Sequence, residues 1–249
     1  MRVLPILFNT DMVRAILDGR KMVTRRLVKP QIPDVCPECM HIHADYIYDR
    51  IAENIYCAIC GEPLQPEIKP SYQPGDILYV RETWNTNPLH DYGNESNEYV
   101  YKADYDGHAG EFGWRPSIHM PKEAARIWLK VTDVRVERLQ DITEEQVNEE
   151  GFRFKPPCLT LVSADGHCCN LDGPCTSKIK YCDMSMGELF GKELWNSTIK
   201  KADVDRYGWA ANPYVWVIEF ERCEEPEEDG SDRSSEWKNN FMHKFCKID

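Results

Sequence analysis

The sequence predicts an α+β protein whose strands form a small mixed or barrel-like core, decorated by two cysteine-rich loops. Most apolar stretches have the length and alternation of strands, whereas three short stretches have helical spacing. The two kinds do not alternate regularly, as they would in a parallel βαβ protein. The chain has 249 residues, of which 42% are hydrophobic, so it can bury a sizeable core.

The first predicted element is a short buried strand over residues 3–8. A helix over residues 9–19 follows, because Asn9 or Thr10 can cap its start and Gly19 suits its end. The segment behind this helix, "GRKMVTRR", concentrates positive charge. It is either a solvated loop after a helix or a site for an anion or a polar substrate.

The later elements are predicted from alternation and capping residues. The stretch 126–139 alternates with period two and changes register once. The final strand, 213–222, carries Tyr214, Trp216, Ile218 and Phe220 on one face. Capping boxes at Thr143/Gln146 and Ser185/Glu188 open two helices. The expected strands are 75–84, 98–103, 126–139 and 213–222, and the expected helices are 141–152 and 185–201.

These elements divide the chain into a discontinuous core and additions to it. Residues 1–33 and 70–222 form the predicted core. The additions are an inserted module at 34–69, a cysteine-rich insertion at 153–184 and an acidic C-terminal tail at 223–249.

Two CxxC pairs in the first insertion predict a structural metal site. Cys36 and Cys39 are separated from Cys57 and Cys60 by 17 residues, a spacing expected of a four-cysteine zinc ribbon. Two thiolates on each tight turn can close a tetrahedron around Zn²⁺. Since cysteines would fill all four positions, we expect one structural zinc with no open position for catalysis.

A second group of metal-binding residue types lies in the second insertion. Its spacings match no regular knuckle, so a second zinc site and a loop with scattered thiols are both open interpretations. The group comprises Cys158, His167, Cys168, Cys169, Cys175 and Cys182.

The charge and the apolar runs limit the possible partners. A net charge of −12 argues against a long duplex DNA track, although it permits a small local pocket at the basic residues of 20–29. No stretch reads as a signal peptide or a membrane span. We therefore expect a cytoplasmic protein with no membrane partner; the sequence does not indicate an oligomeric state.

The order of the segments resembles that of a known family. The string G-x-K-x-x-T-x-R at 19–26 precedes "PGDILYV", the alternating "WLKVTDVRVERLQDIT", then "EEQVNEEGF" and "VWVIEFER". This order resembles the ASCH domain family of the PUA-like β-barrel superfamily, especially the longer members encoded by phages and prophages. The resemblance covers 3–29, 73–152 and 185–222, and a phage or prophage origin would put the protein in a bacterial host cell.

The resemblance implies a ligand and a set of site residues. The family contains small amidohydrolases that remove the acetyl group from N4-acetylcytidine, and the matching catalytic positions here are Lys21, Thr24 and Glu150. Arg26 matches a further arginine of the string. Other members are implicated in RNA binding or RNA cleavage. The chain departs from the small amidohydrolases in its greater length and its predicted zinc ribbon.

The residue types suit amide hydrolysis, which needs a nucleophile, a base and oxyanion stabilisation. Thr24 offers a hydroxyl, and Arg26 can hold a carbonyl or an oxyanion through its planar fork. For Lys21 to act as a base, burial or neighbouring cations must depress its pKa, whereas pairing with Glu150 would raise it. Arg25 is expected at the surface.

A nucleobase also needs planar faces for stacking. Trp84, Trp114 and His119 are candidates for substrate contact, although tryptophan is equally common in cores. The first functional hypothesis is an amidohydrolase that acts on a modified nucleoside. The alternatives are an RNA-binding or ribonuclease-type ASCH module and a non-catalytic phage accessory protein.

Overall fold

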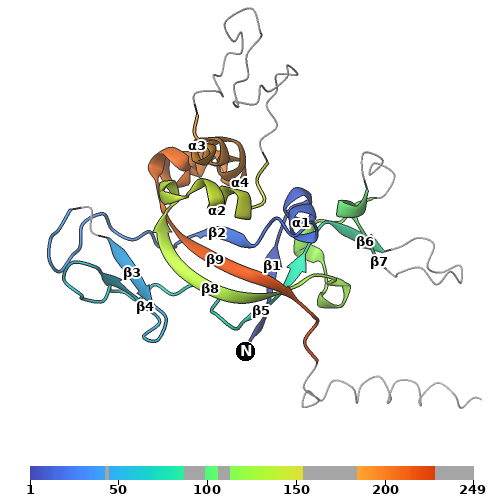
Figure 1. Ribbon diagram of the computed structural model, residues 1–249, viewed down its shortest axis with the longest axis horizontal. Coiled ribbons are helices and arrows are strands. Elements are labelled where there is room, and N and C mark those ends of the chain that lie inside the picture. The colour runs from blue at the N-terminus through green and yellow to red at the C-terminus, as the bar shows by residue number, and fades with distance from the viewer. Residues whose placement is uncertain (43–44, 87–98, 106–112, 154–183, 228–249) are drawn as a thin grey trace, which may run out of the picture.

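The computed structural model describes residues 1–42, 45–86, 99–105, 113–153 and 184–227, and it has the predicted mixed α+β character. Its centre is a five-stranded sheet in the order β1-β5-β8-β9-β2 (Figure 1). The first pair, β1 and β5, is parallel, and the other neighbours are antiparallel. The strands are β1 (Val3–Leu7), β2 (Val23–Leu27), β5 (Ile77–Arg81), β8 (Trp128–Arg138) and β9 (Tyr214–Cys223).

The long antiparallel pair β8 and β9 forms the middle of the sheet. The register shifts between Val131 and Asp133, where the alternation predicted a change. The prediction of one apolar face on β9 was incomplete, because Val215 and Val217 on the other face are fully buried as well. Both faces are covered: one by a large core and the other by a cluster that includes Phe190 and Trp195 from the helices.

Local signals set the helix starts. Asn9 caps α1, and the capping boxes at Thr143/Gln146 and Ser185/Glu188 are both formed. The helix expected over 185–201 ends earlier, since a π-helical stretch at Phe190–Trp195 follows its first turn and the chain leaves the helix after Thr198. The α-helices are α1 (Thr10–Leu17), α2 (Glu144–Glu149), α3 (Met186–Leu189), α4 (Asn196–Thr198) and α5 (Val204–Tyr207).

The cysteine module packs against the sheet with aromatic side chains. Its hairpin consists of β3 (Tyr46–Asp49) and β4 (Asn54–Cys57). Tyr46 contacts Tyr214 edge-on at 5.8 Å between ring centroids, and Tyr48 contacts Trp216 in the same way at 5.1 Å. The module and the sheet therefore share one apolar core.

A second hairpin, β6 (Trp84–Thr86) with β7 (Tyr99–Tyr101), has a small core of its own. The strand expected at 75–84 is therefore two strands, β5 and β6. Short 3-10 turns complete the fold at Lys102–Asp104, Ser117–His119, Lys122–Ala124, Leu139–Asp141, Lys201–Asp203 and Trp209–Ala211.

Two predicted additions fall largely outside the described residues. These are the cysteine-rich insertion, of which 154–183 are not described, and the acidic tail beyond residue 227. Among the helices that the structure does describe, none has the length and apolarity needed to cross a membrane.

Candidate functional site

The basic string brings a fully buried lysine to the end of α2. Lys21 forms an isolated β-bridge with Glu150, and none of its side chain is exposed. Its Nζ donates to Glu150 Oε2 at 2.6 Å, to the Glu150 carbonyl at 3.1 Å and to the Val23 carbonyl at 2.7 Å. These three acceptors match the three donors of an ammonium group.

Arg25 completes this buried cluster, so its expected surface position was wrong. The Arg25 side chain is 1% exposed; its Nη1 lies 3.2 Å from Glu150 Oε1 and its Nη2 donates to Gln146 Oε1 at 2.7 Å. Gln146 also closes the capping box of α2. The helix that supplies Glu150 is thereby tied to β2 by two side chains.

A glycine allows the end of α2 to approach Lys21. Gly151 has a φ of 76° and ends the helix, as the sequence predicted. A Cβ at this position would lie 2.6 Å from the Ala15 Cβ and 3.0 Å from the Lys21 Cβ. A larger residue there would therefore push Glu150 away from its partner.

The sequence left open whether burial or pairing dominates the ionisation of Lys21. Burial is the larger influence and lowers the pKa of Lys21 below its ordinary value, although Glu150 opposes this. The positive charges of Arg26 and Arg25 add to the lowering. Burial therefore makes the charged form of Lys21 less favourable than it is in water.

Thr24 and Glu150 line the same small cavity. Thr24 lies in β2 and is buried, and the cavity beside it has a volume of about 60 Å³. Phe190, Leu194 and Trp195 of the helical segment form its other wall. The space suits waters or a small acyl group, whereas sites for whole ligands usually measure about 300 Å³ or more.

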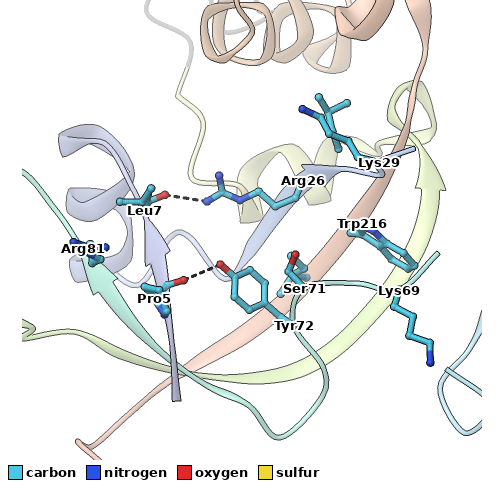
Figure 2. A pocket seen from close by; sticks show the side chains of 11 residues that line it. Pro5, Leu7, Arg26, Lys29, Lys69, Ser71, Tyr72, Arg81 and Trp216 are labelled. Atoms are coloured by element: carbon cyan, nitrogen blue, oxygen red, sulfur yellow. Dashed lines mark hydrogen bonds between the residues drawn. The ribbon is translucent and has the colours of Figure 1, made fainter. Parts of the chain in front are cut away.

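A larger cavity lies between the two end strands of the sheet, β1 and β2 (Figure 2). Its volume is about 370 Å³, and Arg26 lines both this cavity and the small one. The aromatic side chains of Tyr72 and Trp216 also line it. Among the described residues that line it, four are cationic and none carries a carboxylate; the cations are Arg26, Lys29, Lys69 and Arg81.

Within the described residues, no backbone ladder joins β1 to β2; instead β1 accepts hydrogen bonds from one side chain of β2 and one of the segment before β5. Arg26 Nη2 donates to the Leu7 carbonyl at 2.9 Å, and the Tyr72 hydroxyl donates to the Pro5 carbonyl at 2.8 Å (Figure 2). In the described part of the chain, the sheet therefore ends at these strands instead of closing by a backbone ladder. The unclosed edge is where the large cavity forms.

The three expected stacking residues lie elsewhere. Trp84 is buried in the small hairpin core, with its ring 5.7 Å from that of Tyr99. Trp114 is half-buried 5.6 Å from the Tyr105 ring, and His119 is exposed in a 3-10 turn. None of the three lines either cavity.

Sequence reasoning missed most residues of the large cavity, although it named Arg26 as a substrate-binding residue and Arg81 as a secondary pocket candidate. Lys69 is the last residue of the inserted module, Ser71 and Tyr72 follow it, and Arg81 ends β5. The only signal was the return to strand character after them, which does not reveal that these residues face β2.

The four cysteines of the first insertion converge as predicted. The Sγ atoms of Cys36, Cys39, Cys57 and Cys60 all lie within 4.8 Å of one another. The Cys36–Cys60 and Cys39–Cys57 Sγ distances are 3.8 Å and 4.0 Å. Zn–S bonds of ~2.3 Å in a tetrahedron place sulfurs about 3.8 Å apart, so the cluster fits a metal ion such as zinc.

The backbone and the thiol pKa values also suit metal binding. Each pair is followed by a left-handed residue, Met40 with a φ of 55° and Gly61 with a φ of 74°. The Cys39 backbone N–H is the main influence that lowers the pKa of Cys36 to about 7. The Glu62 N–H lowers the pKa of Cys60, but burial and the neighbouring thiols outweigh it and raise that pKa to about 12. A cation would relieve this conflict between close thiolates.

The second predicted group of metal ligands, from Cys158 to Cys182, lies outside the described residues. Comparison of the chain with protein-family models, curated proteins and solved structures finds no match.

Proposed function

We propose that the protein is an ASCH-type amidohydrolase, with the five-stranded sheet as an incompletely closed PUA-like barrel, and that it acts on a modified cytidine such as N4-acetylcytidine. One observation carries the proposal: Lys21 and Glu150, 129 residues apart, form a buried ion pair, and Thr24 lines a cavity with Glu150. These are the three residues that the resemblance assigns to catalysis.

The arrangement suggests a role for each group. The Thr24 hydroxyl attacks the acyl carbon while Glu150 accepts its proton, and Glu150 then returns that proton to the departing cytosine amine. Water hydrolyses the resulting threonine ester with Glu150 again as the base, which releases acetate. Lys21 positions Glu150, because all its donors are directed at acceptors of the cluster.

The two cavities divide the substrate between them. The small cavity beside Thr24 takes the acyl group, and the large cavity takes the nucleoside. Arg26 lines both and is the donor available to the carbonyl oxygen as negative charge develops. The aromatic side chains of Tyr72 and Trp216 replace the stacking residues expected from the sequence.

The assay is release of cytidine from N4-acetylcytidine by zinc-loaded protein. We expect Thr24→Val to abolish turnover, Thr24→Ser to retain part of it, and Glu150→Gln to lower kcat/KM by roughly 100-fold or more. Lys130→Ala, which alters an exposed lysine paired with Glu221, is the matched control. Absence of turnover by folded wild-type protein contradicts the proposal.

The cysteine cluster supports a second part of the proposal, a structural zinc held by Cys36, Cys39, Cys57 and Cys60. With four protein ligands the ion would supply folding energy and leave no coordination position for substrate. Elemental analysis of protein purified without chelator should find about one zinc per chain, and Cys57→Ser should lose it. Metal-free, fully folded protein would rule the site out.

A non-catalytic RNA-binding module is the second candidate, and burial of the cluster favours it. Lys21 has no exposed side-chain surface, and the cavity at Thr24 is about 60 Å³. A purely structural cluster would look the same. This candidate predicts RNA binding without turnover, with an affinity that falls as salt increases. Failure to bind any RNA at low salt eliminates it.

A further inference from the structure

We propose that the cavity between β1 and β2 binds a phosphate group, so that the ligand is a nucleotide or an RNA end rather than a free nucleoside. The nucleoside part of this inference rests on the proposed function, whereas the phosphate part rests on the cavity alone.

The charge of the cavity is opposite to that of the chain. The net charge is −12, yet the described part of the cavity wall contains four cations and no carboxylate. Among the described residues, Arg26, Lys29 and Arg81 have no carboxylate within ion-pair distance, and only Lys69 is shared with Glu67 and Glu53. Cations gathered without counter-charges attract an anion.

The arginines offer donors that the fold does not use. A guanidinium has five N–H donors, and within the described residues Arg26 directs one of them to a backbone oxygen, the Leu7 carbonyl. Arg81 donates from Nη2 to the Ile118 carbonyl, whereas its Nε is buried and has no acceptor in the described structure. A phosphate supplies several acceptor oxygens, and arginine forks match its geometry.

Arg26 lines the cavity but is partly buried, so its positive charge faces a ligand while being less well solvated than in water. Its guanidinium lies 5.5 Å from the centre of the Phe8 ring, and Lys21 Nζ lies at the same distance from that ring. Burial lowers the pKa of Arg26 below its ordinary value. A bound anion would offset the desolvation that lowers it.

The other lining residues favour a nucleotide over a bare anion. Tyr72 projects into the space between the strands, and Trp216, from β9, lies to its right in Figure 2. These planar side chains can contact a base or a sugar while the cations hold the phosphate. The exposed Ser71 hydroxyl adds a polar group to the wall. A volume of about 370 Å³ is in the range of small-ligand sites.

The test is isothermal titration of zinc-loaded protein with cytidine, cytidine 5′-monophosphate, inorganic phosphate and a short oligocytidylate. We expect the monophosphate or the oligonucleotide to bind at least about tenfold more tightly than cytidine, with an affinity that falls as salt rises. Preference for the monophosphate would indicate a terminal phosphate, and preference for the oligonucleotide a phosphodiester. Equal binding of cytidine and both phosphorylated ligands overturns the inference.

The double variant Lys29→Gln/Lys69→Gln tests whether the phosphate binds in this cavity. Both lysines line the cavity and are exposed, so their replacement leaves the core intact. It should reduce the preference for phosphate without changing cytidine binding, whereas Lys130→Ala should change neither. A preference that survives in the double variant contradicts this site. None of these ligands carries an acetyl group, so the titration is independent of whether the protein hydrolyses N4-acetylcytidine. If the protein hydrolyses N4-acetylcytidine but shows no preference for phosphorylated ligands, only the phosphate inference is overturned.

Discussion

Two adjacent arginines of β2 have opposite surroundings. Arg25 extends toward α2, where Glu150 and Gln146 accept its hydrogen bonds and 1% of its side chain is exposed. Arg26 extends toward β1, where a backbone carbonyl and a ring are its contacts and a cavity lies beside it. Successive residues of a strand point to opposite faces, so a single basic string serves both sides of the sheet.

The positive charge that this acidic chain concentrates at 20–29 is divided between two environments. Lys21 and Arg25 are neutralised by carboxylates in the buried cluster, and their charge is part of the fold. Arg26 and Lys29 remain without carboxylate partners in the described structure and border the cavity. Of these four residues, two are therefore paired within the fold and two have no carboxylate partner among the described residues.

Removal of zinc from the proposed cysteine site should produce the largest difference between the two faces of the sheet. The cysteine module supports the cavity through the contact between Tyr48 and Trp216, whereas α2 packs on the opposite face. Structural zinc contributes about 10–16 kcal/mol of apparent binding energy at neutral pH. After chelation, hydrogen exchange should increase in 46–57 and 68–72 while 144–150 stays protected. Equal loss of protection in both regions contradicts this separation.

Breaking the buried pair should give the next largest effect. Lys21→Met leaves Glu150 with Arg25 as its remaining charged partner, and removing one member of a buried pair costs about 3–5 kcal/mol. Lys130→Met, at an exposed pair of 3.9 Å, should cost about 1 kcal/mol or less. Urea unfolding measures both. Similar losses would mean that the burial of Lys21 has no energetic consequence.

The pH dependence of zinc affinity should be a smaller effect on the cavity side. In the metal-free protein the pKa of Cys36 is about 7 and that of Cys60 about 12, so zinc must displace protons at neutral pH. Affinity should therefore rise between about pH 6 and pH 8. Competition with a chromophoric chelator measures the dissociation constant, and a constant value across this range contradicts the assignment of thiol ligands.

Local signals predicted much of the fold. Asn9, Thr143 and Ser185 cap the helices that begin after them, because a cap depends only on residues within one turn. The cysteine cluster was predictable because each CxxC pair forms a local turn and the separation of 17 residues is that of a four-cysteine ribbon. Lys21 and Glu150 were paired only through the family resemblance, since nothing local joins residues so far apart in sequence.

The remaining features depend on distant contacts. From the sequence alone Arg25 is predicted at the surface, because its contact with Glu150 forms only when α2 packs beside β2. Trp84 reads as a stacking residue, yet the hairpin gives it a core of its own with Tyr101 and Met120. The large cavity joins residues from β1, β2, β5, β9 and the segment after the cysteine module, and its charge becomes apparent only when these segments meet.

The most direct test of the division of charge compares Arg25→Met with Arg26→Met in urea unfolding and in titration with cytidine 5′-monophosphate. We predict that Arg25→Met lowers the unfolding free energy by about 1.5–3 kcal/mol, because a buried carboxylate loses a charged donor. Arg26→Met should cost less than about 1 kcal/mol but weaken nucleotide binding about tenfold or more. Equal destabilisation by both substitutions, with unchanged nucleotide affinity in Arg26→Met, would contradict the account.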